Sequence, residues 1–329
     1  MRPILEVREL SIHASSGGQP IPLVEKVSFS VEKGATLALV GESGCGKSMT
    51  ALSLMRILPE PAVRIVGGEI RFEDEDLVSA SERRMEQLRG NIISMIFQDP
   101  IASLNPIQTV GDQIVEVIRT HNPISRKEAR ARAIELLRSV RLPDAERRIN
   151  YYPHRLSGGM CQRVMIAMAM AGAPKVIIAD EPTTALDTTV QAQVMALLRK
   201  AQTETGTAII LITHNLAAAA EAAENVAVMY AGRIIEQGPV REIFLSPAHP
   251  YTEGLLGAIP DNAEGGVEIA PLAEIPGNVP RPGTLPSGCA FAPRCKNVQQ
   301  RCRNERPDLT AHGNRRVACF FPYSQMIAQ

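Results

Sequence analysis

The sequence contains no tryptophan, and phenylalanine and tyrosine bring the aromatic fraction to only 4%. Stacking on bases or sugars is therefore not expected to be the main activity of the protein. There is also no excess of charge, because 35 lysines and arginines balance 35 aspartates and glutamates. Proteins that bind nucleic acid normally carry a basic excess, so we expect no nucleic-acid partner.

The sequence also lacks a long apolar run, since a segment that crosses a bilayer takes about 20 such residues. The most apolar stretch, at 164–174, is typical of a buried helix. Near the N-terminus, Glu6, Arg8 and Glu9 interrupt the apolar stretch that an export signal would need. We therefore expect a chain that neither spans a membrane nor is exported. The six cysteines are too few for a disulfide scaffold.

The 329 residues are enough for about two domains with a sizeable core, and the 45% apolar content is ordinary for a globular protein. Up to about residue 245, short β-rich runs alternate with helical stretches. Two near-continuous apolar runs, 176–180 and 208–213, are typical of strands buried on both faces of a parallel sheet. The pattern predicts an α/β fold. Further strands are predicted at 4–10, 27–31, 36–40, 69–72, 92–97 and 226–231.

Three helices are predicted from their end signals. Ser125 and Glu128 form a capping box at the start of a helix that Pro143 terminates. A second helix begins at Ser157 and ends near Gly172. A third covers 188–205, with Gly206 as its C-terminal cap.

The composition changes after Pro239, because prolines recur through the rest of the chain. Proline disrupts helices and central strands, so this part is predicted to be rich in loops and to need something besides a core to hold it. We predict two domains, 1–245 and 246–329. The second contains the four cysteines Cys289, Cys295, Cys302 and Cys319.

A glycine-rich segment at 41–48 fits the pattern Gly-x-x-x-x-Gly-Lys-Ser between an apolar strand and a helix-like stretch. Glycines allow successive backbone N–H groups to surround phosphate oxygens, and the following helix N-terminus adds its positive end. Lys47 is expected to reach the β- and γ-phosphates and Ser48 to bind Mg²⁺. The segment consists of Gly41, Glu42, Ser43, Gly44, Cys45, Gly46, Lys47 and Ser48.

Two acidic residues, Asp180 and Glu181, end the apolar run at 176–180. An aspartate at such a strand end holds Mg²⁺, usually through water, in other phosphate-loop proteins. A second acid beside it can polarise the attacking water as a general base.

The order of five motifs resembles the ATP-binding-cassette (ABC) ATPases over residues 5–240. They read GESGCGKS, FQDP, LSGGMCQR, ADEPTTALD and LITHN. The resemblance implies a P-loop cassette with a RecA-like core, a β-subdomain and an α-helical signature subdomain at about 100–172, here followed by a loop-rich C-terminal extension. It also implies ATP and Mg²⁺ as ligands and ATP hydrolysis as the activity.

The same resemblance assigns roles to single residues. Gln98 corresponds to the glutamine that contacts Mg²⁺, the attacking water and the membrane partner. Asp180 corresponds to a Mg²⁺ ligand and Glu181 to the catalytic base. His214 corresponds to the switch histidine on the γ-phosphate.

Such cassettes pair head to tail, so each ATP lies between the phosphate loop of one subunit and the signature of the other. Leu186 and Asp187 correspond to the loop that communicates across the dimer. The signature residues that would contact the partner's ATP are Leu156, Ser157, Gly158, Gly159 and Met160.

Three positions depart from the cassette pattern. His13 and Ala14 stand where many cassettes place an aromatic residue that stacks on adenine, so nucleotide selectivity is expected to be loose. Asn215 replaces a common aspartate, with a small expected effect. Cys45 lies in the phosphate loop, where we expect the helix N-terminus to lower the pKa of its thiol and expose it to oxidation.

Residues 246–260, the proline-rich tail and the segment 97–106 resemble cassettes of dipeptide, oligopeptide and nickel importers, most nearly the D-type ATPase of dipeptide importers. This implies an ATPase that powers peptide import. The ATPase would be a peripheral protein on the cytoplasmic face of the bacterial inner membrane. Its implied partners are two membrane-spanning permease subunits, a sister ATPase in a heterodimer or a second copy in a homodimer, and indirectly an external solute-binding protein. The alternatives are import of nickel or another small solute and, from a different class, a soluble ABC ATPase of repair or translation.

The four cysteines of the tail follow the spacing C-x₅-C-x₆-C-x₁₆-C. Zinc prefers closer pairs, whereas four thiolates around a [4Fe–4S] cluster tolerate looser spacing. The resemblance to dipeptide importers favours the cluster. Zinc and free thiols stay open as alternatives.

Overall fold

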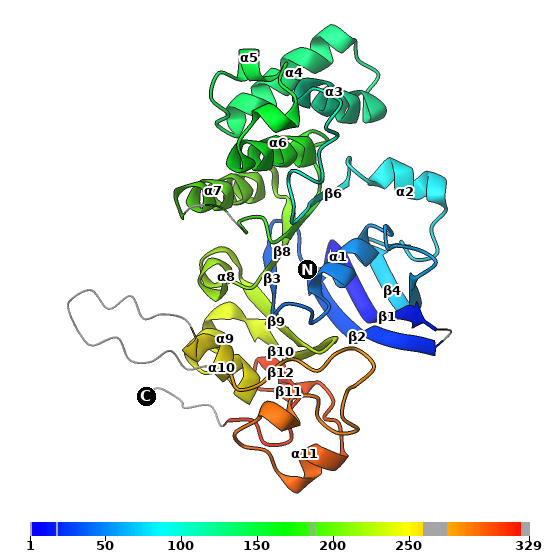
Figure 1. Cartoon of the computed structure of the whole chain (residues 1–329), viewed down its shortest axis with the longest axis vertical. Helices are drawn as coiled ribbons and strands as arrows, with labels where there is room; N and C mark the ends of the chain where they lie inside the picture. Colours follow the sequence, from blue (N-terminus) through cyan, green and yellow to red (C-terminus); the bar gives the residue numbers. More distant parts are fainter. Residues whose placement is uncertain (1, 18, 185, 187, 259–274, 324–329) are drawn as a thin grey trace, which may run out of the picture. The chain divides into compact units, whose positions relative to one another are not determined.

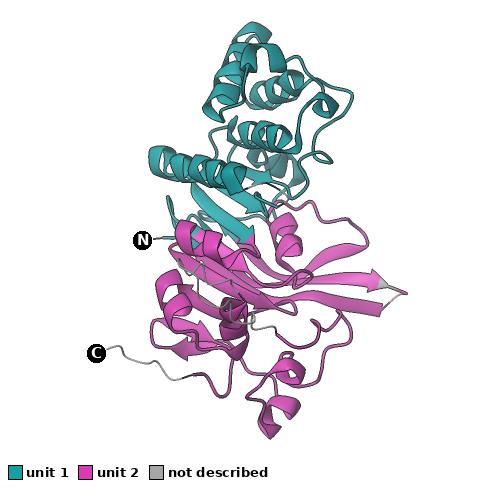
Figure 2. Ribbon diagram, turned by 60° about the vertical axis from the view of Figure 1, so that its left-hand side comes forward, with its two compact units in different colours: residues 1–5, 31–36, 71–212 teal, residues 6–30, 37–70, 213–329 magenta. Residues whose placement is uncertain are grey.

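The computed structural model describes residues 2–17, 19–184, 186, 188–258 and 275–323. The chain folds into two compact units, which Figure 2 distinguishes by colour. Unit 1 comprises 1–5, 31–36 and 71–212, and unit 2 comprises 6–30, 37–70 and 213–329. The chain passes between the units several times, so neither is a single continuous segment.

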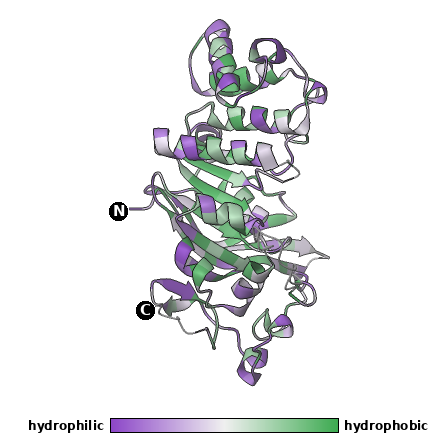
Figure 3. Cartoon of the chain, turned by 90° about the vertical axis from the view of Figure 1, so that its left-hand side faces the viewer, coloured by the Kyte–Doolittle hydropathy of each residue, from purple (hydrophilic) through white to green (hydrophobic). Residues whose placement is uncertain are grey.

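Three parallel strands lie at the centre of unit 1: β6 (Ile93–Ile96), β7 (Val176–Asp180) and β8 (Ala208–Thr213). Every residue of these strands is buried, and Figure 3 shows the central strands mainly in green, the hydrophobic colour. Helix α7 (Thr188–Thr205) connects β7 to β8, as parallel strands require. The predictions at 176–180, 208–213 and 188–205 are confirmed, and Gly206 has the left-handed φ of +68° expected of a C-terminal cap.

The remaining helices of unit 1 include three that pack against one another: α3 (Val110–His121), α4 (Arg126–Ser139) and α6 (Gly158–Met170). The predicted capping box is present, because the Ser125 N–H donates to the Glu128 carboxylate at 2.9 Å and the Glu128 N–H donates back to Ser125 Oγ at 3.2 Å. The short elements of this unit are β5 (Glu75–Asp76), α2 (Glu82–Leu88), α5 (Ala145–Arg148) and η1 (Pro153–Arg155). In the described parts of the chain, no helix is both long enough and apolar enough to cross a membrane.

Unit 2 contains two sets of strands (Figure 1). In one, β1 (Leu5–Ser16) lies between β2 (Gln19–Val31) and β4 (Val63–Phe72). In the other, β3 (Thr36–Val40) pairs in parallel with β9 (Asn225–Tyr230), which continues through a two-residue turn into antiparallel β10 (Arg233–Pro239). The longer helices of this unit are α1 (Lys47–Leu54), α8 (Leu216–Ala222), α9 (Val240–Leu245) and α10 (Pro250–Gly257).

The C-terminal extension adds two strands to β10, which the proline-rich sequence does not indicate. Strand β12 (Arg315–Val317) pairs antiparallel with β10, and β11 (Thr310–His312) pairs with β12. The only other regular elements described in the extension after residue 258 are η2 (Ala292–Arg294) and α11 (Gln300–Asn304). Loops therefore predominate in the described part of the extension, which is also attached to the sheet through β12.

An aromatic cluster also fixes the extension. Tyr230 of β9, Tyr251 of α10 and Phe291 before η2 are buried, with ring centroids 4.7 to 5.4 Å apart. Tyr230 and Tyr251 are each at most 1% exposed. Burial and ring contacts of this kind stabilise a fold by several kcal/mol, on the order of 2 kcal/mol for each fully buried ring. The tail thus shares the core of unit 2, a contribution that the sequence does not indicate.

A buried acid lies beside this cluster. Glu236 is fully buried and accepts hydrogen bonds from the N–H groups of Ala248 at 2.9 Å and His249 at 3.0 Å, and from Arg315 of β12 at 3.3 Å. A buried carboxylate needs such partners, because an unpaired one is costly. Through these hydrogen bonds, Glu236 links β10 to the start of α10 and to β12, the last strand of the extension.

His249 gives the stability of unit 2 a pH dependence. It caps α10 by accepting the Tyr251 N–H on Nδ1 at 3.0 Å, and burial lowers its pKa to about 3. An unfolded histidine titrates near pH 6.5, so below that pH the unfolded chain binds a proton that the folded chain excludes until about pH 3. The free energy of unfolding should therefore fall with acidity by up to about 1.4 kcal/mol per pH unit from this residue alone.

Urea unfolding from about pH 7 to about pH 5 measures this effect. The control is His249→Asn, which retains a helix-capping side chain but cannot titrate. The wild-type stability should fall more steeply than that of the variant. Equal slopes would contradict the assignment.

Candidate nucleotide-binding site

The phosphate loop of unit 2 joins β3 to α1, as the motif requires. Gly41 has a φ of +152°, and a Cβ there would lie 2.3 Å from the Met229 carbonyl oxygen on β9. Gly46, with a φ of +105°, caps α1. Both positions need glycine, because one lacks space and the other has a left-handed backbone. The backbone N–H groups at the start of α1 consequently form a positive helix end suited to phosphate.

Lys47 is the first residue of α1 and is only 5% exposed. Its Nζ donates to the carbonyl oxygens of Gly41 at 2.7 Å and Glu42 at 2.9 Å. The ammonium is therefore held over the loop, where charge-assisted hydrogen bonds to an anion are available to it. Ser48 follows in the first turn of the same helix.

Cys45 differs from the prediction. Its thiol is fully buried, and burial raises its pKa although the Lys47 ammonium acts in the opposite direction. The expected lowering by the helix N-terminus is outweighed, because desolvation penalises the thiolate. The expectation of an oxidation-prone thiol is therefore wrong for the folded protein.

In unit 1, Glu181 directly follows β7 with a left-handed φ of +47°. Its Oε2 accepts hydrogen bonds from the Gln98 side-chain amide at 2.9 Å and from Thr184 Oγ1 at 2.8 Å. Asp180, the last residue of β7, is 4% exposed. The structure thus brings Gln98 and Glu181 together and holds the carboxylate in one orientation.

The signature residues stand at the start of α6 in unit 1. Ser157 is the N-cap, and its Oγ accepts the Met160 N–H at 3.4 Å. Ser157 and Gly158 are exposed, and a Cβ on Gly158 would meet nothing within 4 Å. The first residues of this helix are therefore exposed to solvent, so an anion can approach the helix start. The two flanking positions, Leu156 and Met160, are half-buried.

Leu186 lies against the signature helix. A Cβ added at Gly159 would be 3.4 Å from Val190 and 4.0 Å from Leu186. The neighbouring Asp187 lies outside the described residues. Gln162 of α6, which the motif analysis did not single out, is 2% exposed and donates its amide to the Pro182 carbonyl at 2.8 Å. The sequence signal for this contact was a glutamine within the motif LSGGMCQR, near the start of a largely apolar helix.

His214 belongs to unit 2, where it is exposed between β8 and α8. The next residue, Asn215, caps α8 by accepting the Ala218 N–H at 3.1 Å. Asparagine caps helices as well as aspartate does, so this departure from the pattern leaves the helix start intact. His13 and Ala14 line a cavity of about 210 Å³ in the same unit, and none of its lining residues has a phenyl or phenol ring.

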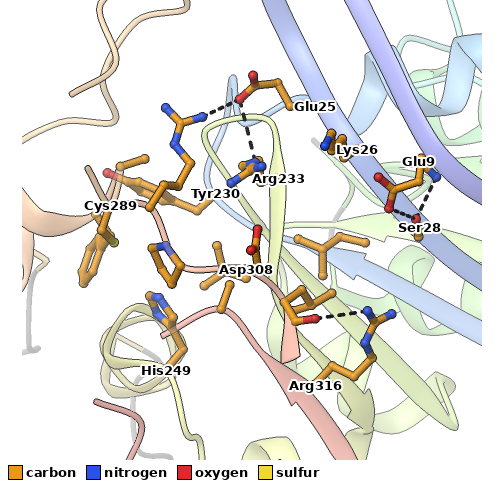
Figure 4. A pocket seen from close by; sticks show the side chains of 18 residues that line it. Glu9, Glu25, Lys26, Ser28, Tyr230, Arg233, His249, Cys289, Asp308 and Arg316 are labelled. Atoms are coloured by element: carbon orange, nitrogen blue, oxygen red, sulfur yellow. Dashed lines mark hydrogen bonds and ion pairs between the residues drawn. The ribbon is translucent and has the colours of Figure 1, made fainter. Parts of the chain in front are cut away.

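The four cysteines of the extension line one small cavity of about 20 Å³. The Cys289 N–H also donates to the Cys302 carbonyl at 2.8 Å. Cys289 lines a second, larger cavity of about 270 Å³ as well, which Figure 4 shows with Tyr230 and His249 at its wall. Among the described residues, no group of three or more histidines, cysteines, aspartates or glutamates is placed to hold a single metal ion.

Comparison with known proteins places the chain. Residues 24–184 match the family described as ABC transporter, and 235–302 match the oligopeptide/dipeptide transporter, C-terminal region. The oligopeptide transport ATP-binding protein AppD of Bacillus subtilis is 50% identical over 321 residues, which cover 97% of each chain. This chain belongs to the ABC transporter family. The dipeptide transport ATP-binding protein DppD of Haemophilus influenzae is 46% identical over 322 residues, 98% of this chain and 96% of DppD.

A solved ABC cassette supports the same placement. A dimeric ATP-binding cassette in a post-hydrolysis state, bound to ADP and Pi, matches with a TM-score of 0.66 and 26% identity. The match covers 72% of this chain and 99% of that one. The predicted cassette fold is confirmed. As a member of this family, the chain is an ATPase coupled to transport, and ABC ATPases use ATP with Mg²⁺. The solved cassette is itself a dimer.

The buried thiol of Cys45 leads to a labelling prediction. At about pH 8, N-ethylmaleimide should modify Cys45 at least about ten-fold more slowly in the native chain than in urea, because the reactive thiolate is suppressed and covered. Mass spectrometry of the labelled peptides measures both rates. Equal rates in the two states would restore the original expectation of a reactive thiol.

Proposed function

We propose that this ABC ATPase hydrolyses ATP to power import of di- or oligopeptides across the bacterial inner membrane. The observation that carries the proposal is the union in one chain of a cassette with an extension matching the oligopeptide/dipeptide transporter C-terminal region. Relatives that cover nearly the whole chain bear the names oligopeptide and dipeptide transport ATP-binding protein. Selectivity for one solute is expected to reside in the partners, so nickel and other small solutes remain the alternative cargo.

The phosphate loop would bind the triphosphate. The N–H groups at the start of α1 face the anion, and Lys47 exchanges its two loop carbonyls for β- and γ-phosphate oxygens. Ser48, Gln98 and Asp180 are the residues that would hold Mg²⁺, and their hydroxyl, amide and carboxylate oxygens suit this ion. Bound Mg²⁺ supplies charge neutralisation on the phosphates.

Glu181 would act as the general base on the attacking water, and His214 would contact the γ-phosphate. The support for the base is its carboxylate, which two donors fix at 2.8 and 2.9 Å. An oriented carboxylate at the end of a buried strand can accept a proton as the water attacks, and phosphoryl transfer then depends mainly on positioning.

The open start of α6 would bind the ATP held by a second cassette. The exposed Ser157 and Gly158 support this role, and Leu186 and Asp187 would relay it across the dimer. The second cassette is a sister ATPase in a heterodimer, with a homodimer as the alternative. ATP is then enclosed only when the two cassettes close on it. ATP binding therefore shifts the equilibrium from the open to the closed dimer, and this change can drive the permease.

The transporter would contain two membrane-spanning permease subunits and draw on an external solute-binding protein. This chain would lie on the cytoplasmic face of the membrane as a peripheral subunit. The rival class is a soluble ABC ATPase of repair or translation. Purification from membranes separates the two, since the importer ATPase should be recovered with both permease subunits and the rival without them.

The catalytic assignment predicts the behaviour of Glu181→Gln. This variant should lower ATP turnover by about 10²- to 10⁴-fold, because the base is lost while the shape is kept. Its affinity for ATP should stay close to wild type. The matched control is Lys47→Ala, which should lose ATP binding itself. Turnover equal to wild type in Glu181→Gln would remove Glu181 from this role.

We also propose that Cys289, Cys295, Cys302 and Cys319 hold a [4Fe–4S] cluster. The support is that all four line one cavity, although none of the described groupings suits a single ion. The ligands of a cubane cluster bind different iron atoms and therefore stand farther apart than the ligands of one zinc ion. When bound, the cluster would supply a covalent cross-link among the loops of the extension.

Iron and sulfide analysis tests this proposal. Anaerobically purified chain should contain about four irons and four sulfides. Cys302→Ser should lose both, whereas Cys161→Ser, whose cysteine is buried in α6, should retain them. Zinc without sulfide would establish the second alternative. Absence of all three would leave free thiols.

A further inference from the structure

Glu42, the second residue of the phosphate loop, is held by side chains that lie more than 200 positions further along the chain. Its carboxylate accepts two hydrogen bonds from the Arg294 guanidinium, at 2.6 and 2.9 Å. Its backbone N–H donates to the Tyr251 hydroxyl oxygen at 2.9 Å. All three residues belong to unit 2.

Arg294 is built into its place rather than lying loosely on the surface. Its side chain is 4% exposed, against 31% for Glu42. Nε donates to the Pro276 carbonyl at 2.9 Å, and the guanidinium lies 5.8 Å from the centre of the Tyr230 ring. A bidentate pair with this degree of burial fixes both distance and direction, unlike an exposed ion pair.

Tyr251 is equally fixed. It is fully buried in the aromatic cluster, 4.7 Å from Tyr230 and 5.4 Å from Phe291 between ring centres. Its hydroxyl therefore offers the Glu42 N–H an acceptor whose position the core determines. Arg294 ends η2, whose first turn follows Phe291, so both contacts to Glu42 come from the same cluster.

The contacts continue from Glu42 to the phosphate-binding lysine. The carbonyl oxygen of Glu42 accepts from Lys47 Nζ at 2.9 Å. Glu42 thus uses its N–H, its carboxylate and its carbonyl at once, on Tyr251, Arg294 and Lys47. A change in the orientation of Glu42 would move the carbonyl that holds the lysine.

We propose that Arg294 and Tyr251 are positioning residues for nucleotide binding: through Glu42 they hold the phosphate loop in the shape that accepts a triphosphate. The inference rests on the proposed role of Lys47 and its loop. A loop already held in its binding shape loses less conformational entropy when the nucleotide arrives. The C-terminal extension would therefore raise the affinity of the cassette for ATP.

The test is the affinity of the full chain for the ATP analogue AMP-PNP with Mg²⁺, measured by calorimetry, together with KM and kcat. Arg294→Met should raise Kd and KM by about ten-fold and leave kcat within about two-fold. Arg294→Lys should recover part of the affinity, because it keeps the charge but not the bidentate geometry. Glu42→Gln combined with Arg294→Met should weaken binding no more than the worse single variant.

Two further variants separate positioning from loss of folding. Lys296→Met removes a neighbouring charge of the extension that pairs with Glu253, at 2.8 Å, and should bind like wild type. Tyr251→Phe removes only the acceptor oxygen, so hydrogen exchange at the Glu42 amide should accelerate while the thermal midpoint changes by only a few degrees.

The outcomes are distinct. If Lys47→Ala abolishes AMP-PNP binding but Arg294→Met binds like wild type, the positioning role is overturned and the nucleotide site stands. If the losses of Glu42→Gln and Arg294→Met add fully, the two residues do not act through one contact and the inference also fails. If Lys47→Ala binds like wild type, the proposed function itself is wrong.

Discussion

The close passage of Gly41 beneath β9 is the constraint on which unit 2 depends. A Cβ there would lie 2.3 Å from the Met229 carbonyl, so the loop can leave β3 only as bare backbone. This closeness follows from the parallel pairing of β3 with β9, which sets the point where the loop begins. The turn at Gly46 then directs the start of α1 toward the loop. Without those two glycines, the N-terminus of α1 and the Lys47 ammonium would not both point into the phosphate loop.

Three kinds of interaction attach the extension to the rest of unit 2, and one of them reaches the phosphate loop. Strand β12 contributes backbone hydrogen bonds to β10, the ring cluster contributes burial, and Arg294 contributes a directed charge to Glu42. Loops alone are poor anchors, because ordering each residue costs about 1 to 2 kcal/mol. Shared burial around Tyr230 offsets that cost. The extension is consequently part of the core that supports the phosphate loop.

What the sequence could predict was local, and what it could not was long-range. The runs at 176–180 and 208–213 are apolar up to their last residue, and Ser125 with Glu128 is a self-contained signal, so these elements could be located from the sequence. Strand β10 was missed, since its turn uses Ala231 and Gly232 rather than an asparagine–glycine pair. No periodicity joins Glu42 to Arg294. The thiol of Cys45 was misjudged because its neighbours in sequence favour a thiolate, whereas its neighbours in space exclude water.

In unit 1, a few hydrogen bonds likewise fix the Glu181 carboxylate and the loop that carries it. Glu181 adopts a left-handed backbone that is unfavourable for a non-glycine residue, and such strain persists only where surroundings enforce it. Gln98 and Thr184 hold the Glu181 side chain. Gln162, in the signature helix α6, donates to the carbonyl of the next residue, Pro182. The helix whose open end faces outward at Ser157 and the loop that carries Glu181 are therefore one hydrogen-bonded piece. Gln162 is therefore the buried contact that joins the start of α6 to the residue after Glu181.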